Sequence, residues 1–187
     1  DGRILALSGR QAKNDPCPSK NAECVPGFAP ELALEPFAPA ASIFKLITAT
    51  ALIDRGVPTS RKTCFHGGLR AVDAGNLVDT PRDVQCETLG YAVSESQNAL
   101  IAKLAHRHLD ALRLTVVAQK FGFDRALEFA LPAQFGSVAL PRDEIGFARA
   151  AAGFWSSQLS PLGGALVALT IASDGVQVAA KGRRTCN

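Results

Sequence analysis

The chain has 187 residues, of which 47% are hydrophobic and 20% are charged, the composition of an ordinary globular domain. Its formal net charge of +3 is small, and no run of Lys and Arg is longer than two residues, which argues against a nucleic-acid-binding protein. The longest apolar segment, 163–172, is about half of the roughly 20 residues that span a bilayer. These features predict one globular unit with no nucleic-acid partner.

The first elements expected along the chain are a strand and a helix. Alternating apolar residues in RILALS predict a short strand over 3–8. The segment 9–39 is rich in Pro, Asn, Lys and Gly without a period, so it is expected to be mostly loop. An apolar helix follows over 42–54. The segment 59–87 is again expected to be loop, because it is crowded with Gly and Pro.

The remainder is predicted to be mainly helical. Asp110 is expected to cap one helix that stops at Gly122, and Ser160 with Pro161 forms an N-cap and N1 pair for the last one. The expected helices cover 88–93, 98–109, 110–120 and 160–175, with a partly helical segment over 142–155.

Five cysteines indicate an oxidising compartment. No Cys-x-x-Cys occurs, and the three histidines complete no zinc pattern, so no metal site is expected. Cys17 and Cys24 flank one polar loop, and Cys64 and Cys86 bracket another, so each pair is predicted to form a disulfide. Cys186 is left over. The alternative is that all five are reduced thiols, since cysteine is also a good core residue.

The apolar helix holds a serine and a lysine one turn apart. Lys45 lies among apolar residues, where a lysine is seldom buried without a partner, and it shares a helix face with Ser42. Burial would lower the pKa of Lys45, so that a neutral amine takes the proton of a serine that lies at the positive end of the helix dipole. The alternative is that Ser42 only caps the helix and Lys45 extends its amine into water.

A break between two predicted helices carries a second pair of polar residues. The segment YAVSESQNALIAKLA places Ser96 and Asn98 on a polar turn, where a hydroxyl and a carboxamide would face one cleft. A lone Ser-x-Asn is commonplace and usually belongs to a helix cap, so the order of the segments along the chain has to decide.

Five segments, in this order, resemble the transpeptidase domain of penicillin-binding proteins, the serine enzymes that cross-link peptidoglycan. They are DGRILALSG, PFAPAASIFKLITATALIDRG, CETLGYAVSESQNALIAKLAHRHL, VVAQKFGF and LSPLGGALVALTIASDG. Ala40 and Ala41 replace the family's usual Pro-Gly before the serine helix. The resemblance implies the α+β fold that the family shares with serine β-lactamases, a helical cluster plus an antiparallel sheet, over residues 1–187.

The resemblance also implies roles for four residues. Ser42 would be the acylated nucleophile and Lys45 its base, Ser96 would relay a proton, and Asn98 would bind the substrate amide. The expected partners are D-Ala-D-Ala stem peptides and β-lactam antibiotics, and no cofactor is expected. The implied location is periplasmic or extracytoplasmic, with a membrane anchor in the full-length protein.

One departure from the family is substantial, because no Lys-Thr-Gly or Lys-Ser-Gly occurs in the chain. We therefore expect a fold that is incomplete at the C-terminus, whose third motif and missing strands come from further sequence or from a complementing chain. Two other functions stay open. The chain would be a serine β-lactamase, or a catalytically inactive domain that binds peptidoglycan or a protein.

Overall fold

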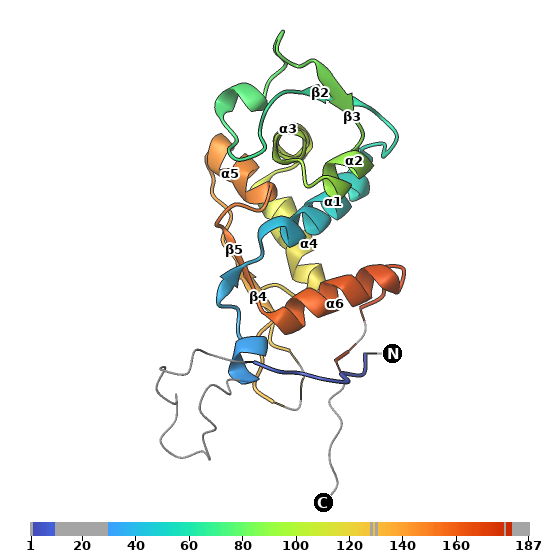
Figure 1. The fold of residues 1–187 in the computed structure, drawn as a ribbon, viewed down its shortest axis with the longest axis vertical. Coiled ribbons are helices and arrows are strands. Elements are labelled where there is room, and N and C mark those ends of the chain that lie inside the picture. Colours follow the sequence, from blue (N-terminus) through green and yellow to red (C-terminus); the bar gives the residue numbers. More distant parts are fainter. Residues whose placement is uncertain (1, 10–29, 128, 130, 178, 181–187) are drawn as a thin grey trace, which may run out of the picture.

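The computed structural model describes residues 2–9, 30–127, 129, 131–177 and 179–180, and helices dominate it (Figure 1). The α-helices are α1 (Phe44–Asp54), α2 (Leu89–Ser94), α3 (Asn98–His108), α4 (Ala111–Phe121), α5 (Glu144–Ala151) and α6 (Pro161–Ala172). Short 3-10 turns are η1 (Pro30–Ala33), η2 (Ala41–Ile43) and η3 (Ala74–Asn76). The strands are β1 (Ala38–Pro39), β2 (Thr63–Phe65), β3 (Gln85–Glu87), β4 (Gly136–Val138) and β5 (Ser157–Leu159).

Helix ends largely follow the predicted signals. The side chain of Asp110 accepts the backbone N–H of Arg113, and that of Ser160 accepts the N–H of Gly163. Gly122 ends α4 in the left-handed conformation, with φ of 117°. The last helix is shorter than predicted, because it ends at Ala172 and a turn follows.

The strand predicted over 3–8 is wrong. Only Arg3 takes part in an isolated bridge there, since a strand persists only where a neighbour satisfies its backbone groups. The described strands instead pair among themselves. β5 lies between β1 and β4 in an antiparallel sheet, with Ala38 opposite Leu159 and Gly136 also opposite Leu159. Strands of two or three residues are too short to show a period, which is why the sequence did not reveal them.

The segment 59–87 is also more ordered than the predicted loop. β2 and β3 form an antiparallel pair in which Cys64 lies directly opposite Cys86, and a disulfide joins the two sulfurs. This is the bridge that the sequence predicts. Cys17, Cys24 and Cys186 lie outside the described residues, so the second predicted bridge stays a prediction.

Two hydrophobic clusters meet at α1. Phe44 and Ile47 belong to the cluster shared with α4, α6 and the three-stranded sheet, while Ala49 and Leu52 belong to the one shared with α3 and the β2–β3 pair. Accordingly α1 lies between the upper and lower parts of the molecule in Figure 1. A helix that is covered on several sides cannot easily send a polar side chain into water.

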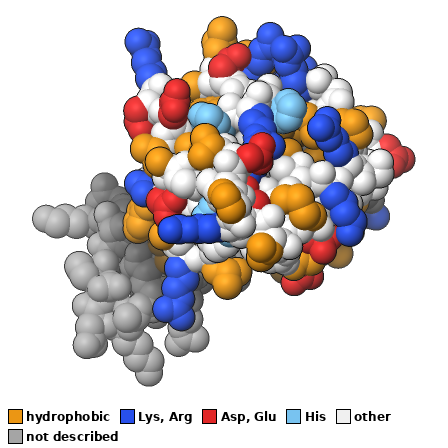
Figure 2. Space-filling model, turned by 90° about the horizontal axis from the view of Figure 1, so that it is seen from above, with side chains coloured by type: hydrophobic (Ala, Val, Ile, Leu, Met, Phe, Trp, Pro, Cys, Tyr) orange, Lys and Arg blue, Asp and Glu red, His pale blue; other side chains and the backbone are white. Residues whose placement is uncertain are grey.

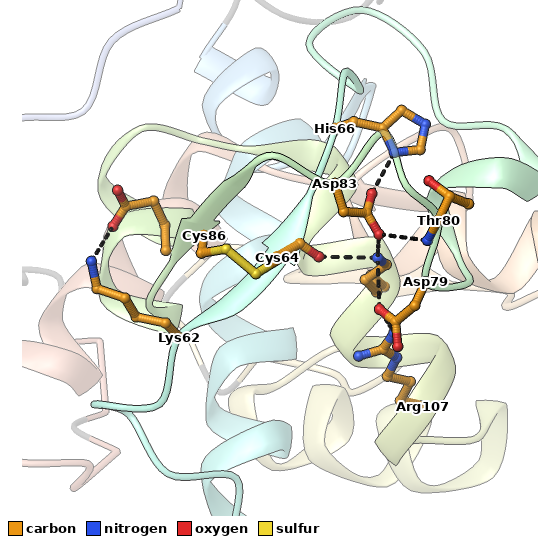
Figure 3. The surroundings of a disulfide bond; sticks show 10 residues. Lys62, Cys64, His66, Asp79, Thr80, Asp83, Cys86 and Arg107 are labelled. Carbon is orange, nitrogen blue, oxygen red and sulfur yellow. Dashed lines mark hydrogen bonds and ion pairs between the residues drawn. A yellow bond between two sulfur atoms is a disulfide. The ribbon is translucent and has the colours of Figure 1, made fainter.

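A second buried lysine joins the disulfide-bonded segment to α3. Figure 3 shows the side chains of Asp79, Asp83 and His66 near the Cys64–Cys86 disulfide. Lys103 is fully buried, and its Nζ donates to the carbonyl of Cys64 at 3.0 Å, to Asp83 at 2.6 Å and to Asp79 at 3.3 Å. His66 also bonds Asp83 through Nδ1. The molecular face seen in Figure 2 mixes Lys and Arg with acidic and hydrophobic side chains. The carboxylates that compensate the charge of Lys103 are those of Asp79 and Asp83.

The network holds Asp83 ionised. Burial alone would raise the pKa of this carboxyl, whose side chain is 5% exposed. Hydrogen bonds from His66, from Lys103 and from the backbone N–H of Thr80 outweigh burial and lower the pKa well below its usual range. The carboxylate is therefore negative at neutral pH and pairs with the Lys103 ammonium.

Removing the cation should destabilise the protein strongly. We expect Lys103→Met to lower the free energy of unfolding by about 3–5 kcal/mol, because it leaves the buried Asp83 carboxylate without its main partner. The double variant Lys103→Met/Asp83→Asn should recover part of that loss. Urea unfolding of the two single variants and the double variant measures the coupling, and strictly additive losses would contradict a direct pair.

The disulfide should contribute through the unfolded state. It links residues with a sequence separation of 22, so chain entropy predicts about 3 kcal/mol of stabilisation. We expect the Cys64→Ser/Cys86→Ser variant to lose about that much in urea unfolding, and dithiothreitol to destabilise the wild type more than the variant, in which only the predicted Cys17–Cys24 bridge could still be reduced. Recovery of Cys64 and Cys86 as free thiols in non-reducing peptide mapping would contradict the bridge.

Candidate active site

Ser42 sits at the start of α1 on a strained approach. The N-cap role considered for it is wrong: Ala40 caps η2, no side chain makes a capping bond there, and Ser42 lies within the 3-10 turn that leads into α1. Ala41, just before it, has a φ of 49°, which non-glycine residues seldom adopt. Gly153 packs against this turn, since a Cβ on it would lie 2.2 Å from the carbonyl oxygen of Ala41.

Lys45 is buried one turn further on and bonds two serines. Its side chain is 2% exposed, and its Nζ lies 2.9 Å from Ser42 Oγ and 2.9 Å from Ser96 Oγ. The two hydroxyl oxygens are 2.7 Å apart, so the three groups form a closed triangle. Burial lowers the pKa of Lys45, as the sequence predicts. The alternative in which the amine extends into water does not fit this geometry.

Ser96 reaches the triangle from the turn between α2 and α3. It adopts the left-handed conformation, with a φ of 53°. The backbone N–H of Gln97 bonds the carbonyl of Ala92 at 2.8 Å, and the buried Gln97 side chain caps α3 through Ala99. The break that the sequence predicts at 94–97 is therefore a tightly bonded turn, and it holds the Ser96 hydroxyl against the start of α1.

Asn98, the first residue of α3, is oriented by the segment 67–69. Its Nδ2 donates to the carbonyl of Leu69 at 3.0 Å. Gly68 allows this close approach: its φ is 73°, and a Cβ there would lie 2.2 Å from the Cβ of Ala99. One amide N–H is thus used by the backbone, which leaves the carbonyl oxygen and the second N–H of the Asn98 side chain for a ligand.

A pocket of about 280 Å³ brings three of the four predicted site residues together. Its lining consists of Pro39, Ala41, Ser42, Lys45, Asn98, Ala152, Gly153, Phe154 and Trp155. Ser96 is absent from that lining but bonds both Ser42 and Lys45. A larger pocket of about 410 Å³ lies near the end of α1 and the start of β2, and it contains none of these four residues. Of these two pockets, only the smaller one contains predicted site residues in its lining.

The arrangement suits proton transfer and nucleophilic attack. A neutral amine can accept the Ser42 proton, and the exposed Ser42 hydroxyl opens into the pocket. No group of three or more His, Cys, Asp or Glu in the described part of the chain is placed to hold a metal ion. No helix among the described residues has the length and apolarity to cross a bilayer.

Sequence reasoning missed two features near the site. Phe154 and Trp155 line the pocket, and their position directly after Gly153 is the one signal in the sequence that could have indicated them. Lys103 was also missed. It carries the same signal as Lys45, a lysine within an apolar helical run, and the same argument would have found it.

Known proteins resemble this chain in sequence and in fold. The family model of the penicillin-binding protein transpeptidase domain matches residues 1–181. No curated protein matches the chain significantly. Among solved structures, penicillin-binding protein A from Mycobacterium tuberculosis is similar, with a TM-score of 0.65 and 24% identity over 78% of this chain.

Two further structures show the same likeness. A peptidoglycan glycosyltransferase from Burkholderia ambifaria has a TM-score of 0.66 at 21% identity over 83% of this chain, and the D,D-transpeptidase domain of one from Eggerthella lenta has 0.62 at 25% over 82%. The match spans 34% of the Mycobacterium tuberculosis chain, 49% of the Burkholderia ambifaria chain and 40% of the Eggerthella lenta chain. The chain belongs to the penicillin-binding protein transpeptidase family.

Proposed function

We propose that the chain is a serine acyltransferase of peptidoglycan synthesis, acylated on Ser42 by D-Ala-D-Ala stem peptides and by β-lactams. The observation that carries the proposal is the triangle of Ser42, Lys45 and Ser96, with oxygen–oxygen and nitrogen–oxygen distances of 2.7–2.9 Å. Burial lowers the pKa of Lys45, and its hydroxyl partners do not compensate an ammonium as a carboxylate would, so the neutral amine that a base needs is favoured.

The proposed reaction consists of acylation of Ser42 followed by release of the acyl group. Neutral Lys45 takes the Ser42 proton while Ser42 Oγ bonds to the carbonyl carbon of the terminal D-Ala-D-Ala amide. The oxyanion that forms accepts the backbone N–H of Ser42. Ser96 passes the proton from Lys45 to the departing amine as the C–N bond breaks, and an ester on Ser42 remains. An acceptor amine or water then attacks the carbonyl carbon of that ester and loses a proton to Lys45, which returns a proton to Ser42 Oγ as the ester bond to Ser42 breaks. Asn98 binds the amide of the acyl donor.

Relatives support this assignment. Penicillin-binding protein A from Mycobacterium tuberculosis is known as a penicillin G acyl-enzyme complex, at a TM-score of 0.61 and 24% identity. Another similar chain belongs to a peptidoglycan synthase complex that coordinates polymerisation and cross-linking. With the Cys64–Cys86 disulfide, these relatives favour a periplasmic or other extracytoplasmic location, with a membrane anchor in the full-length protein.

A second candidate function rests on one observation. No Lys-Thr-Gly or Lys-Ser-Gly occurs in the 187 residues, which favours a domain that binds peptidoglycan or a partner protein without turnover. For the acyltransferase, another part of the protein or a complementing chain supplies the carboxylate-binding lysine and the second oxyanion donor. A serine β-lactamase would share the same triangle and differ in rapid release of the acyl group by water.

The nucleophile is testable by intact-mass spectrometry of the full-length protein after penicillin treatment, with peptide mapping. We expect one adduct on Ser42, none in Ser42→Ala, and at least about 100-fold slower acylation in Lys45→Arg, because a guanidinium stays protonated. Ser94→Ala is the matched control, since Ser94 is exposed and bonds only the carbonyl of Tyr91. An adduct in Ser42→Ala would refute the assignment, an adduct without turnover of D-Ala-D-Ala peptide would favour the binding domain, and rapid penicillin hydrolysis the β-lactamase.

The pH dependence of acylation should report Lys45. Because burial lowers its pKa, the neutral amine becomes available below the usual lysine range of about 10.4, so the acylation rate should rise with pH to a plateau before that value. Stopped-flow measurement of the acylation rate of the wild type from about pH 5 to about pH 10 gives the midpoint of this rise. An acylation rate that still rises steeply at the upper end of this pH range, with no plateau, would contradict the role of Lys45 as base.

A further inference from the structure

Trp155 is held in a conformation and an environment that the stability of the fold does not explain. Its φ is 60°, a region that bulky residues rarely enter and that commonly marks a functional site. Its side chain is 83% exposed, so it gains little from burial. Glycine would adopt this backbone conformation without steric cost, and the indole here stays in water.

The backbone around Trp155 is firmly fixed. The N–H of Phe154 bonds the carbonyl of Arg149 at 3.0 Å, and the N–H of Ser156 bonds the carbonyl of Phe154 at 2.8 Å. The carbonyl of Ser156 in turn accepts the N–H of Ala139 at 2.9 Å. At the other end of the turn, Gly153 packs against Ala41. The backbone that carries the indole therefore has a set position relative to Ser42.

The pocket beside Ser42 combines two kinds of lining. Ser42, Lys45 and Asn98 are the charged or hydrogen-bonding residues of its lining, while Phe154 and Trp155 are its aromatic residues. Its volume of about 280 Å³ holds a small organic group. A ligand whose carbonyl carbon lies at Ser42 Oγ therefore has its neighbouring group within the same pocket as the indole.

We propose that Trp155 is a specificity-determining residue that contacts an apolar group of the acyl donor next to the carbonyl attacked by Ser42. This inference rests on the proposed function, because the donor is the molecule that acylates Ser42. An indole offers a flat apolar face and one N–H donor, so it favours aromatic or aliphatic groups over small or charged ones. Its exposure in the free protein leaves that face ready for the ligand.

The first test measures occupancy without chemistry. Trp155 is the single tryptophan of the 187 residues, so the fluorescence difference between Ser42→Ala and Ser42→Ala/Trp155→Phe belongs to Trp155, whatever the rest of the protein contains. We expect this difference signal to change saturably with a penicillin that carries a phenylacetyl side chain. We also expect acrylamide to quench it in the free protein. An unresponsive signal, or an indole already shielded from acrylamide, would overturn the inference.

The second test measures specificity. Trp155→Gly removes the indole and relieves the positive φ together, so the variant should unfold thermally at the wild-type temperature or above. Its acylation by a phenylacetyl penicillin should slow about tenfold, and its acylation by the matching acetyl penicillin should change little. Val84→Ala is the control, because Val84 is 87% exposed and lines no part of this pocket.

The outcomes separate the two proposals. An equal loss for both penicillins, or no loss for either, overturns the role of Trp155 while Ser42 acylation in the wild type still supports the proposed function. Absence of any adduct in the wild type counts against the proposed function, and the fluorescence titration then decides about Trp155 by itself. Slower acylation of Trp155→Gly by the phenylacetyl penicillin, with little change for the acetyl penicillin, supports the inference.

Discussion

The site depends on the burial of one amine. Lys45 lies on a helix that contributes to both hydrophobic clusters and is 2% exposed, so its amine is largely shielded from water and takes its partners from the protein. The hydroxyls of Ser42 and Ser96 are those partners. Because a hydroxyl stabilises an ammonium far less than a carboxylate does, burial lowers the pKa of Lys45. The packing that places α1 in the middle of the molecule thus also lowers the pKa of Lys45, as the proposed role of a base requires.

Lys103 shows the opposite solution to the same physical problem. It is just as buried, but its Nζ meets two carboxylates and a backbone carbonyl, so an ammonium is compensated there. The ion pair of Lys103 with Asp83 joins α3 to the disulfide-bonded segment. The Leu69 carbonyl of that segment orients Asn98. The two buried lysines therefore differ in their neighbouring oxygens: Lys45, the proposed base, meets hydroxyls, whereas Lys103 meets two carboxylates and a backbone carbonyl.

The sequence predicted those features that depend on local signals. Asp110, Ser160 and Gly122 mark helix ends through their own side chains or φ angles, and Ser42 with Lys45 are placed by helical spacing. The strands could not be predicted, because each has two or three residues and exists only through distant partners. Ser96 is assigned to the site only through the family resemblance, because its distance from Lys45 is set by packing between α1 and α3 and not by spacing along the chain.

Backbone strain is concentrated at the candidate active site. Among the described residues, five non-glycine positions have positive φ, and Ala41, Ser96 and Trp155 all lie at the site. Such residues persist only where their surroundings impose them. Gly153 and the Ala40–Ser157 hydrogen bond impose the conformation before Ser42, and the Gln97 cap imposes the one at Ser96. Because these restraints come from the sheet and from α3, the stability of the core, with Phe44 packed edge-on against Phe123, sustains a strained site that local sequence preferences alone would relax.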